Sequence, residues 1–221
     1  MKFDDAAWDQ WTTWIDEIKS DLSHVVNAKA IFEGFRSVLE KNEAWIMENH
    51  GDRFCRFVVR GYVIHVVLGI RRHTKIKRES ISLARLFDQM QKCAPQITFD
   101  YYMKRFPADP QSFDWQSAMF AKFSENGTTM SADSFRRDLE SLKESADVTE
   151  SYVDKALAHL DSDKFDGQLT FKEIHEAIER FDRLTCRYLG LLKGGIGYDT
   201  LKATVLYPWM RIFDVPLRRP A

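Results

Sequence analysis

Residues 8–22 read WDQWTTWIDEIKSDL, and their apolar side chains recur at alternating steps of three and four positions. This spacing places one continuous apolar stripe on a helix with about 3.6 residues per turn. The stripe consists of Trp8, Trp11, Ile15, Ile18 and Leu22. We therefore predict an opening helix that packs against other helices along its whole length.

The same rhythm recurs downstream and predicts further amphipathic helices. A second, longer helix should begin near Ser23 and stop at residues 49–51, where the glycine suits a left-handed cap. A third should cover residues 54–68, and a fourth should open at Ser80 or Ser82. Because strand-period alternation is almost absent, we expect an all-α helical bundle.

Two more helices are expected near the end of the chain. The first should start at Asp147, which forms a box-like start with Glu150. The second should start at Thr170, which forms a regular capping box with Glu173, and should end at residues 194–195, which are both glycine. Both have the apolar periodicity of core helices.

The chain of 221 residues is long enough for one core, and we expect a single all-α domain over residues 1–221. Its core should comprise about 24–94 and 147–193. Residues 95–146 contain three prolines and an Asn-Gly turn signal, which indicate an irregular insertion. A helix after Ser131 within it should lie on the solvated surface, and residues 194–221 should form a C-terminal extension.

Composition excludes several classes of protein. With 44% hydrophobic residues and 13% aromatic residues, the chain should be globular and well packed. A formal net charge of -1 argues against a globally electrostatic nucleic-acid binder but allows a local basic patch. The three cysteines have no paired spacing, which predicts a reduced, cytoplasmic protein without disulfides.

Membrane, metal and cofactor signals are also missing from the sequence. The N-terminus lacks the layout of a signal peptide, and the most apolar run, residues 54–70, is interrupted by charges and is short for a bilayer crossing. Neither a phosphate-binding glycine loop nor a zinc-protease motif occurs. We expect no membrane association, no cofactor and no metal site.

Residues 153–161, VDKALAHLD, form an amphipathic segment with an Ala-His pair near its end. The segment resembles the signature of the HEPN superfamily (higher eukaryotes and prokaryotes nucleotide-binding), in which an Arg, a polar residue and a His carry RNA cleavage. Asp154 and His159 match the polar residue and the His, whereas Val153 stands at the position of the Arg. The resemblance implies a HEPN-like bundle whose catalytic site, where active, centres on His159 with Asp154 and Lys155 in support.

The order of longer segments extends this resemblance over most of residues 24–193. The segments are WIMENHGDRFCRF, GIRRHTKIKRESISLARLFDQM, YVDKALAHLD and LTFKEIHEAIERFD. In this order they resemble the abortive-infection AbiU-like branch of HEPN proteins. The resemblance implies a homodimer with a role in phage defence or a toxin-antitoxin setting, with RNA or a nucleotide and an antitoxin-like protein as partners. The alternative is a non-catalytic HEPN-like module that binds a nucleotide or a protein partner.

Physical chemistry permits two roles for His159. At about 100° per residue, its side chain lies within roughly 20° of Tyr152 and about 40° of Lys155, on one strip beside the apolar face. A His there can transfer protons at a phosphodiester, since its unperturbed pKa lies near 6.5. The other interpretation is a half-buried structural His that bonds a carbonyl or carboxylate at the helix end.

A second Arg and His, Arg60 and His65, fit a loose Arg-x4-His spacing. Helical pitch separates them by about 140°, so the two side chains should point apart. We favour an interpretation in which Arg56 and Arg60, one turn apart, form ion pairs or line a groove.

The stretch from residue 71 to residue 78 carries five Lys or Arg side chains and one His. The candidate RNA-binding residues are Arg71, Arg72, His73, Lys75, Lys77 and Arg78. Contacts of this kind with phosphate give affinity without sequence specificity. The alternative is a solvated loop between helices.

Residues 161–173 resemble a calcium loop with one extra residue, Phe165. Shifting the start to Ser162 places Lys164 at a ligand position, where its charge would repel the ion. Glu173 already belongs to the capping box, so we predict a loop and a helix start here instead of a metal site.

Overall fold

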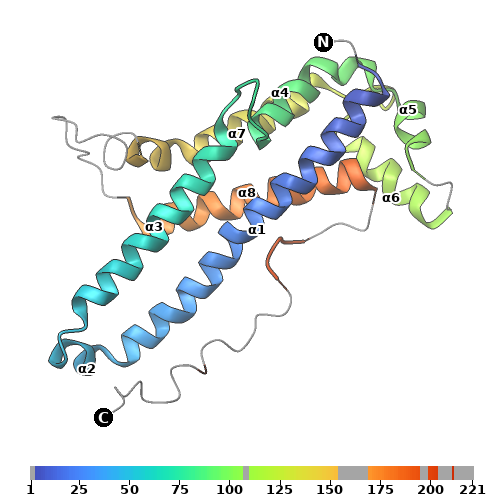
Figure 1. Ribbon diagram of the computed structural model, residues 1–221. Coiled ribbons are helices and arrows are strands. Elements are labelled where there is room, and N and C mark those ends of the chain that lie inside the picture. Colours follow the sequence, from blue (N-terminus) through green and yellow to red (C-terminus); the bar gives the residue numbers. More distant parts are fainter. Residues whose placement is uncertain (1–2, 107–109, 154–168, 195–198, 204–210, 212–221) are drawn as a thin grey trace.

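The computed structural model describes residues 3–106, 110–153, 169–194, 199–203 and 211 of the chain. Most of these residues lie in helices (Figure 1). In chain order the helices are α1 (Asp5–Lys41), α2 (Glu43–Glu48), α3 (Asp52–Thr74), α4 (Leu83–Cys93), a 3-10 turn (Ala94–Gln96), α5 (Phe99–Lys104), α6 (Pro110–Ala121), α7 (Ala132–Tyr152) and α8 (Phe171–Lys193). Apart from one isolated bridge between Thr98 and Thr129, these described residues contain no β structure. The all-α prediction is confirmed.

Helix α1 is one continuous helix of 37 residues, so the predicted break near Ser23 is wrong. The Ser23 hydroxyl donates to the carbonyl of Lys19 at 2.7 Å, and the helix accommodates the serine without interruption. The apolar stripe also continues past it through Val25 and Val26 to Phe32. Neither glycine nor proline occurs at this point, and nothing therefore ends the helix.

The turn between α2 and α3 differs from prediction in one detail. His50, and not Gly51, adopts the left-handed conformation, with φ of 58°. A Cβ on Gly51 would lie 3.0 Å from the Ile46 side chain and 3.2 Å from the Ile46 carbonyl oxygen. Glycine is needed here because the backbone passes close to α2, and not for its φ angle.

Residues 95–146 are more regular than predicted. They contain α5, α6 and most of α7, and α7 runs through Asp147 without a new start. The helix after Ser131 is not a solvated surface helix, because Phe135 and Leu142 are both fully buried. Its charged residues cover one side only, while its apolar side packs against α4 and α8.

The local start and stop signals of two helices are confirmed. Ser82, and not Ser80, caps α4, accepting a hydrogen bond from the Arg85 amide at 3.2 Å. At α8 both halves of the Thr170–Glu173 capping box are formed. The helix ends at Gly194 in the left-handed conformation, with φ of 63°.

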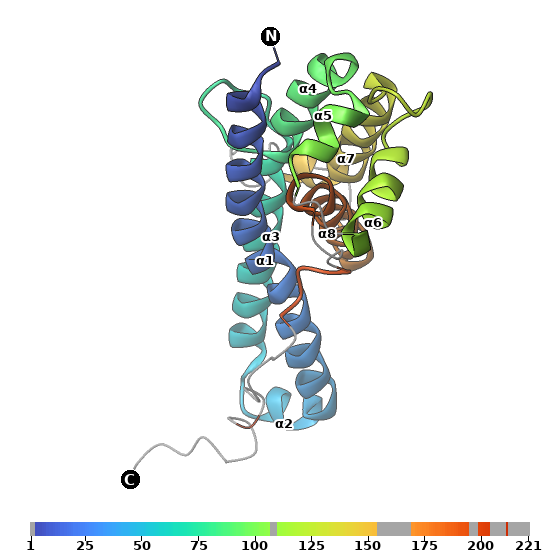
Figure 2. The ribbon, with the colours of Figure 1, turned by 90° about the vertical axis from the view of Figure 1, so that its right-hand side faces the viewer.

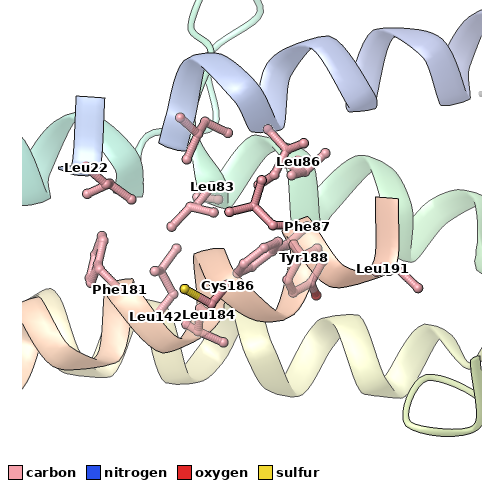
Figure 3. Close-up of a cluster of buried hydrophobic side chains, with 14 of the residues drawn as sticks. Leu22, Leu83, Leu86, Phe87, Leu142, Phe181, Leu184, Cys186, Tyr188 and Leu191 are labelled. Atoms are coloured by element: carbon pink, nitrogen blue, oxygen red, sulfur yellow. The ribbon is translucent and has the colours of Figure 1, made fainter. Parts of the chain in front are cut away.

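One hydrophobic cluster joins α1 and α3 to all the later helices. Figure 3 shows its centre, where side chains from four helices interdigitate. The labelled side chains are Leu22 of α1, Leu83, Leu86 and Phe87 of α4, Leu142 of α7, and Phe181, Leu184, Cys186, Tyr188 and Leu191 of α8. Each large apolar side chain buried in this way contributes about 1.5–3 kcal/mol.

Helices α1 and α3 extend together beyond this cluster and are joined at the far end by α2 (Figures 1 and 2). We call residues 36–61 the arm and the other described residues the body. No residue of the arm is buried. Several of its large apolar side chains are mostly exposed, namely Trp45 at 65%, Met47 at 61%, Phe54 at 62% and Phe57 at 74%.

Candidate functional site

The three residues predicted as catalytic, Asp154, Lys155 and His159, lie outside the described residues. The same holds for residues 161–168 of the calcium-like loop. The chain on either side of this segment is described, at Tyr152 and Val153 and again at Leu169. Val153 is only 2% exposed, so the position where the HEPN resemblance expects an Arg faces the protein interior.

A groove of about 420 Å³ lies between α3 and both flanks of that segment. The α3 side consists of Cys55, Arg56, Val59, Arg60 and Val63, and the opposite side consists of Tyr152, Leu169 and Phe171. The floor is therefore apolar and aromatic, while two guanidinium groups stand on one side. The prediction that Arg56 and Arg60 line a groove is confirmed.

The two arginines of the groove differ in their ion pairing. Arg56 forms an ion pair with Asp52, one turn earlier on α3. Arg60 is exposed, and the described residues offer it no ion-pair partner. A guanidinium group in this position can donate two parallel hydrogen bonds to a phosphate. Arg60 is therefore the side chain of the groove best placed to bind an anion.

Aromatic rings behind Phe171 hold the groove wall in place. Phe32 of α1 and Tyr62 of α3 stack face to face, with ring centroids 3.9 Å apart, and Phe171 packs on Phe32 at 5.1 Å. Burial raises the pKa of the Tyr62 hydroxyl, whose oxygen has no hydrogen-bond partner among the described residues. The wall is thus assembled from three helices, and it presents a fixed ring to the groove.

His175 lies against the same aromatic wall. Its ring packs edge-on to Tyr62 at 6.2 Å, and its Nδ1 lies 3.6 Å from a Glu33 carboxylate oxygen. Burial, reinforced by the nearby Lys29 charge, lowers its pKa. The ring is therefore neutral at pH 7 and acts as part of the hydrophobic packing.

Three of the six residues of the predicted basic stretch are paired with acidic side chains of other helices. Arg72 and His73 both bind Asp21 of α1, at 3.0 Å and 2.9 Å. The hydrogen bond from His73 lowers the pKa of the Asp21 carboxyl. His73 is only 2% exposed, which corrects the expectation that it belongs to a surface patch.

The remaining members of this stretch divide into two groups. Lys75 pairs with Glu150 of α7 at 3.2 Å, and Arg71 is half-buried. Lys77 and Arg78 are exposed. RNA binding by this stretch stays a prediction, and it now rests mainly on Lys77 and Arg78.

A second group of ionisable residues is structural. The buried Asp138 accepts hydrogen bonds from Arg187 at 2.9 Å and from the Tyr188 hydroxyl at 3.0 Å. Burial raises the pKa of this carboxyl, and the Arg187 charge opposes that rise. Both carboxylate oxygens are satisfied, so Asp138 joins α7 to α8 and offers no free group to a substrate.

The sequence alone did not identify Tyr152, Leu169 and Phe171 as groove residues, or Asp21 and Glu150 as partners of the basic stretch. Each of these contacts joins residues at least 51 positions apart or depends on how α7 and α8 meet α3. No local spacing signals such a contact. The i, i+4 spacing of Arg56 and Arg60 was the one local clue.

Neither a metal-binding cluster nor a membrane-spanning helix occurs among the described residues. They contain no cluster of three or more His, Cys, Asp or Glu side chains arranged to hold a metal. Within the same ranges, every helix is too short or too polar to cross a bilayer.

Comparisons with family models, curated proteins and solved structures found no match to this chain.

Proposed function

We propose that this chain is an RNA-directed, HEPN-like protein of the defence or toxin type that binds phosphate in the groove between α3 and α8. The observation that carries the proposal is Arg60, exposed and without an ion-pair partner in the described structure, beside an aromatic floor. Arginine binds the backbone phosphate of single-stranded RNA, and aromatic faces accept its bases. The proposal includes a homodimer and, in a toxin-antitoxin setting, an antitoxin-like protein partner.

The location of the groove relates it to the proposed catalytic residues. Tyr152 and Leu169, which flank the segment containing Asp154, Lys155 and His159, both line it. Arg56 and Arg60 would supply the positive charge that Val153 does not. In the catalytic form of the proposal, His159 transfers a proton during RNA cleavage, and no metal takes part.

The second candidate is a non-catalytic HEPN-like module that binds a nucleotide or a protein partner. The burial of Val153 favours it, because an Arg could not reach solvent from that position without rearrangement. The groove volume of about 420 Å³ is also within the range of ordinary small-molecule sites. The two candidates share the binding site and differ only in chemistry.

Binding is tested by titrating a labelled single-stranded RNA with wild-type protein and with Arg60→Ala at several salt concentrations. Loss of one phosphate contact should weaken binding about tenfold and reduce the salt slope by about one. The matched control is Arg183→Ala, an exposed arginine on α8 about 18 Å along the helix from Phe171. Equal affinity of the Arg60→Ala and wild-type proteins would exclude the groove as the RNA site.

Cleavage is tested separately by incubating the same RNA with wild-type protein and with His159→Ala in the presence of a chelator. Metal-independent cleavage that disappears in the variant would establish the ribonuclease. If neither protein cleaves while Arg60-dependent binding persists, the non-catalytic module is the correct description.

A further inference from the structure

The exposed side of α3 carries an apolar face that no other described part of the chain covers. Phe54, Phe57, Gly61 and Leu68 recur at helical spacing, and His65 lies between the last two. Phe54, Phe57 and Leu68 are 62%, 74% and 43% exposed. The opposite side of α3, with Tyr62, Val66 and Ile70, is buried in the protein, so α3 has two apolar faces and uses only one.

The exposed apolar area of this face is a large part of what an interface needs. Aromatic side chains bury 150–250 Å² each when covered, so Phe54 and Phe57 together expose about 270 Å². Leu68 raises the exposed apolar area of the face to about 350 Å², and Trp45 on the adjoining α2 adds about 150 Å². A stable protein–protein interface buries about 800 Å² on each partner, and this face together with Trp45 supplies more than half of that amount.

The residues of the face are symmetric about Gly61. Phe54 and Leu68 lie seven positions to either side of it, and Phe57 and His65 lie four positions to either side. A two-fold axis at Gly61 would therefore place Phe54 of one copy on Leu68 of the other, and Phe57 on His65. Such pairing of one surface patch with itself is the defining property of a two-fold dimer.

Gly61 suits the point where the two helices cross. A Cβ built on it would have no atom within 4 Å in its own chain, so the glycine serves no close contact within the protomer. A glycine in the middle of a helix costs about 1 kcal/mol relative to alanine. At a crossing point it allows two helix backbones to approach more closely than any other residue would.

Charge along the face is complementary in the same arrangement. The tip of the arm carries Glu43 and Glu48 on α2, whereas the far end of α3 leads to Lys77 and Arg78. From Gly61, α3 extends about 14 Å to Asp52, next to α2, and about 20 Å to Thr74, next to the basic residues, at about 1.5 Å per residue. An antiparallel partner therefore brings its Glu43 and Glu48 toward Lys77 and Arg78 of the first copy, whereas a parallel partner would bring each of these pairs toward its own copy.

We infer that a second copy of this chain packs antiparallel along the exposed face of α3, with a two-fold axis at Gly61. This names the surface and partner for the homodimer contained in the proposed function, but it requires neither RNA binding nor cleavage. The arm of each copy then lies along the body end of its partner's α3, where His65 and Leu68 of that partner cover its exposed Phe57 and Phe54.

The inference is tested by light scattering and sedimentation equilibrium on the full chain. The wild-type protein should be a dimer at micromolar concentration, whereas Phe57→Glu and Gly61→Glu should each weaken the dimer at least a hundredfold. Both sites are open to solvent in the protomer, so circular dichroism should show unchanged helix content. A monomeric wild-type protein at 100 µM, or a dimer that neither variant weakens, would overturn it.

The antiparallel register is tested by reversing charges. Glu43→Lys with Glu48→Lys should weaken the dimer about tenfold, and adding Lys77→Glu with Arg78→Glu should restore it. Failure of the second pair to rescue the first would reject this register. In a Cys55→Ser background, a short bismaleimide should join a Phe54→Cys protomer to a Leu68→Cys protomer, whereas Arg36→Cys, exposed on α1, should give no covalent dimer.

These results are separable from the proposed function. Loss of the dimer in Phe57→Glu with RNA affinity retained would support the interface and leave the groove intact. Loss of RNA affinity in Arg60→Ala with the dimer retained would show the converse.

Discussion

Helices α1 and α3 run through both the body and the arm, yet the body buries most of its large apolar side chains and the arm exposes its own. In the body, Trp8, Trp11 and Phe87 are at most 2% exposed. In the arm no residue is buried, and Trp45 and Phe57 are at least 65% exposed. Folding of one chain covers most large apolar side chains of the body, whereas the arm presents apolar surface that folding of one chain does not cover.

The two regions also differ in how their helices begin. In the body, α4 and α8 have side-chain caps from Ser82 and Thr170. In the arm, neither α2 nor α3 has a side-chain cap at its N-terminus. Side-chain caps thus stabilise these two helices of the body, whereas α2 and α3 lack such caps and depend on packing for their stability.

The largest expected difference between the regions concerns two phenylalanines. Phe87→Ala should destabilise the protein by about 3–5 kcal/mol, because its ring is fully buried and stacks on Tyr188 at 4.1 Å. Phe57→Ala should cost less than about 0.5 kcal/mol in dilute, monomeric protein. Urea unfolding followed by circular dichroism measures both changes in unfolding free energy. Similar changes at the two sites would contradict the difference in burial between body and arm.

Two glycines of α3 give the next comparison. Gly69→Ala should destabilise by about 1–3 kcal/mol, since its Cβ would lie 2.5 Å from the Val25 side chain of α1. Gly61→Ala, in open space, should stabilise the monomer by up to about 1 kcal/mol through helix propensity. Thermal melts at low concentration should therefore shift in opposite directions, and a stabilising Gly69→Ala would contradict the close α1–α3 contact.

The capping box of α8 contributes a smaller amount. Thr170→Ala should cost about 1 kcal/mol, because the Glu173 amide loses its side-chain acceptor. Thr13→Ala is the matched control, since the Thr13 hydroxyl bonds only its own helix and caps nothing. Denaturant midpoints at constant slope measure both changes, and equal midpoints for the two variants would show that the cap is not used.

The smallest effect should appear as a pH dependence. The hydrogen bond from His73, with the charge of Arg72, lowers the pKa of Asp21 below 3.8, so its ionised form stabilises the folded state at pH values above that. This contribution, about 0.5 kcal/mol for a partly exposed carboxyl, is lost as the pH falls through the lowered pKa. Asp21→Asn should therefore flatten the unfolding free energy between pH 5 and pH 2. If the unfolding free energy of Asp21→Asn fell between pH 5 and pH 2 as it does in the wild-type protein, the pKa of Asp21 would not be lowered by folding.

Sequence patterns predicted the features that depend on neighbouring residues. The capping box at Thr170, the cap at Ser82 and the left-handed Gly194 each involve backbone within a few positions, and all three are confirmed. The break at Ser23 and the helix start at Asp147 were wrong. Both residues fit a cap by type, but packing on either side keeps α1 and α7 continuous.

In the candidate site, too, the sequence predicted what depends on neighbouring residues and missed what depends on contacts between distant ones. The spacing of Arg56 and Arg60 predicted that they form ion pairs or line a groove, and the structure shows both residues lining a groove and Arg56 paired with Asp52. The opposite wall depends on how the end of α7 and the start of α8 meet α3, which no local spacing specifies. Likewise, the basic residues after Arg71 were correctly located in the chain, but their acidic partners are distant in sequence.

The exposure of Trp45 gives the protein an intrinsic optical reporter. Trp8, Trp11 and Trp14 are buried and should emit at short wavelength, whereas Trp45, at the tip of the arm, should emit at long wavelength and be quenched by acrylamide. Covering the tip would shift that component toward the blue and shield it from the quencher. The difference between the emission of the wild-type protein and that of Trp45→Phe isolates this component from the other five tryptophans, and it distinguishes a solvated arm from a covered one without any label.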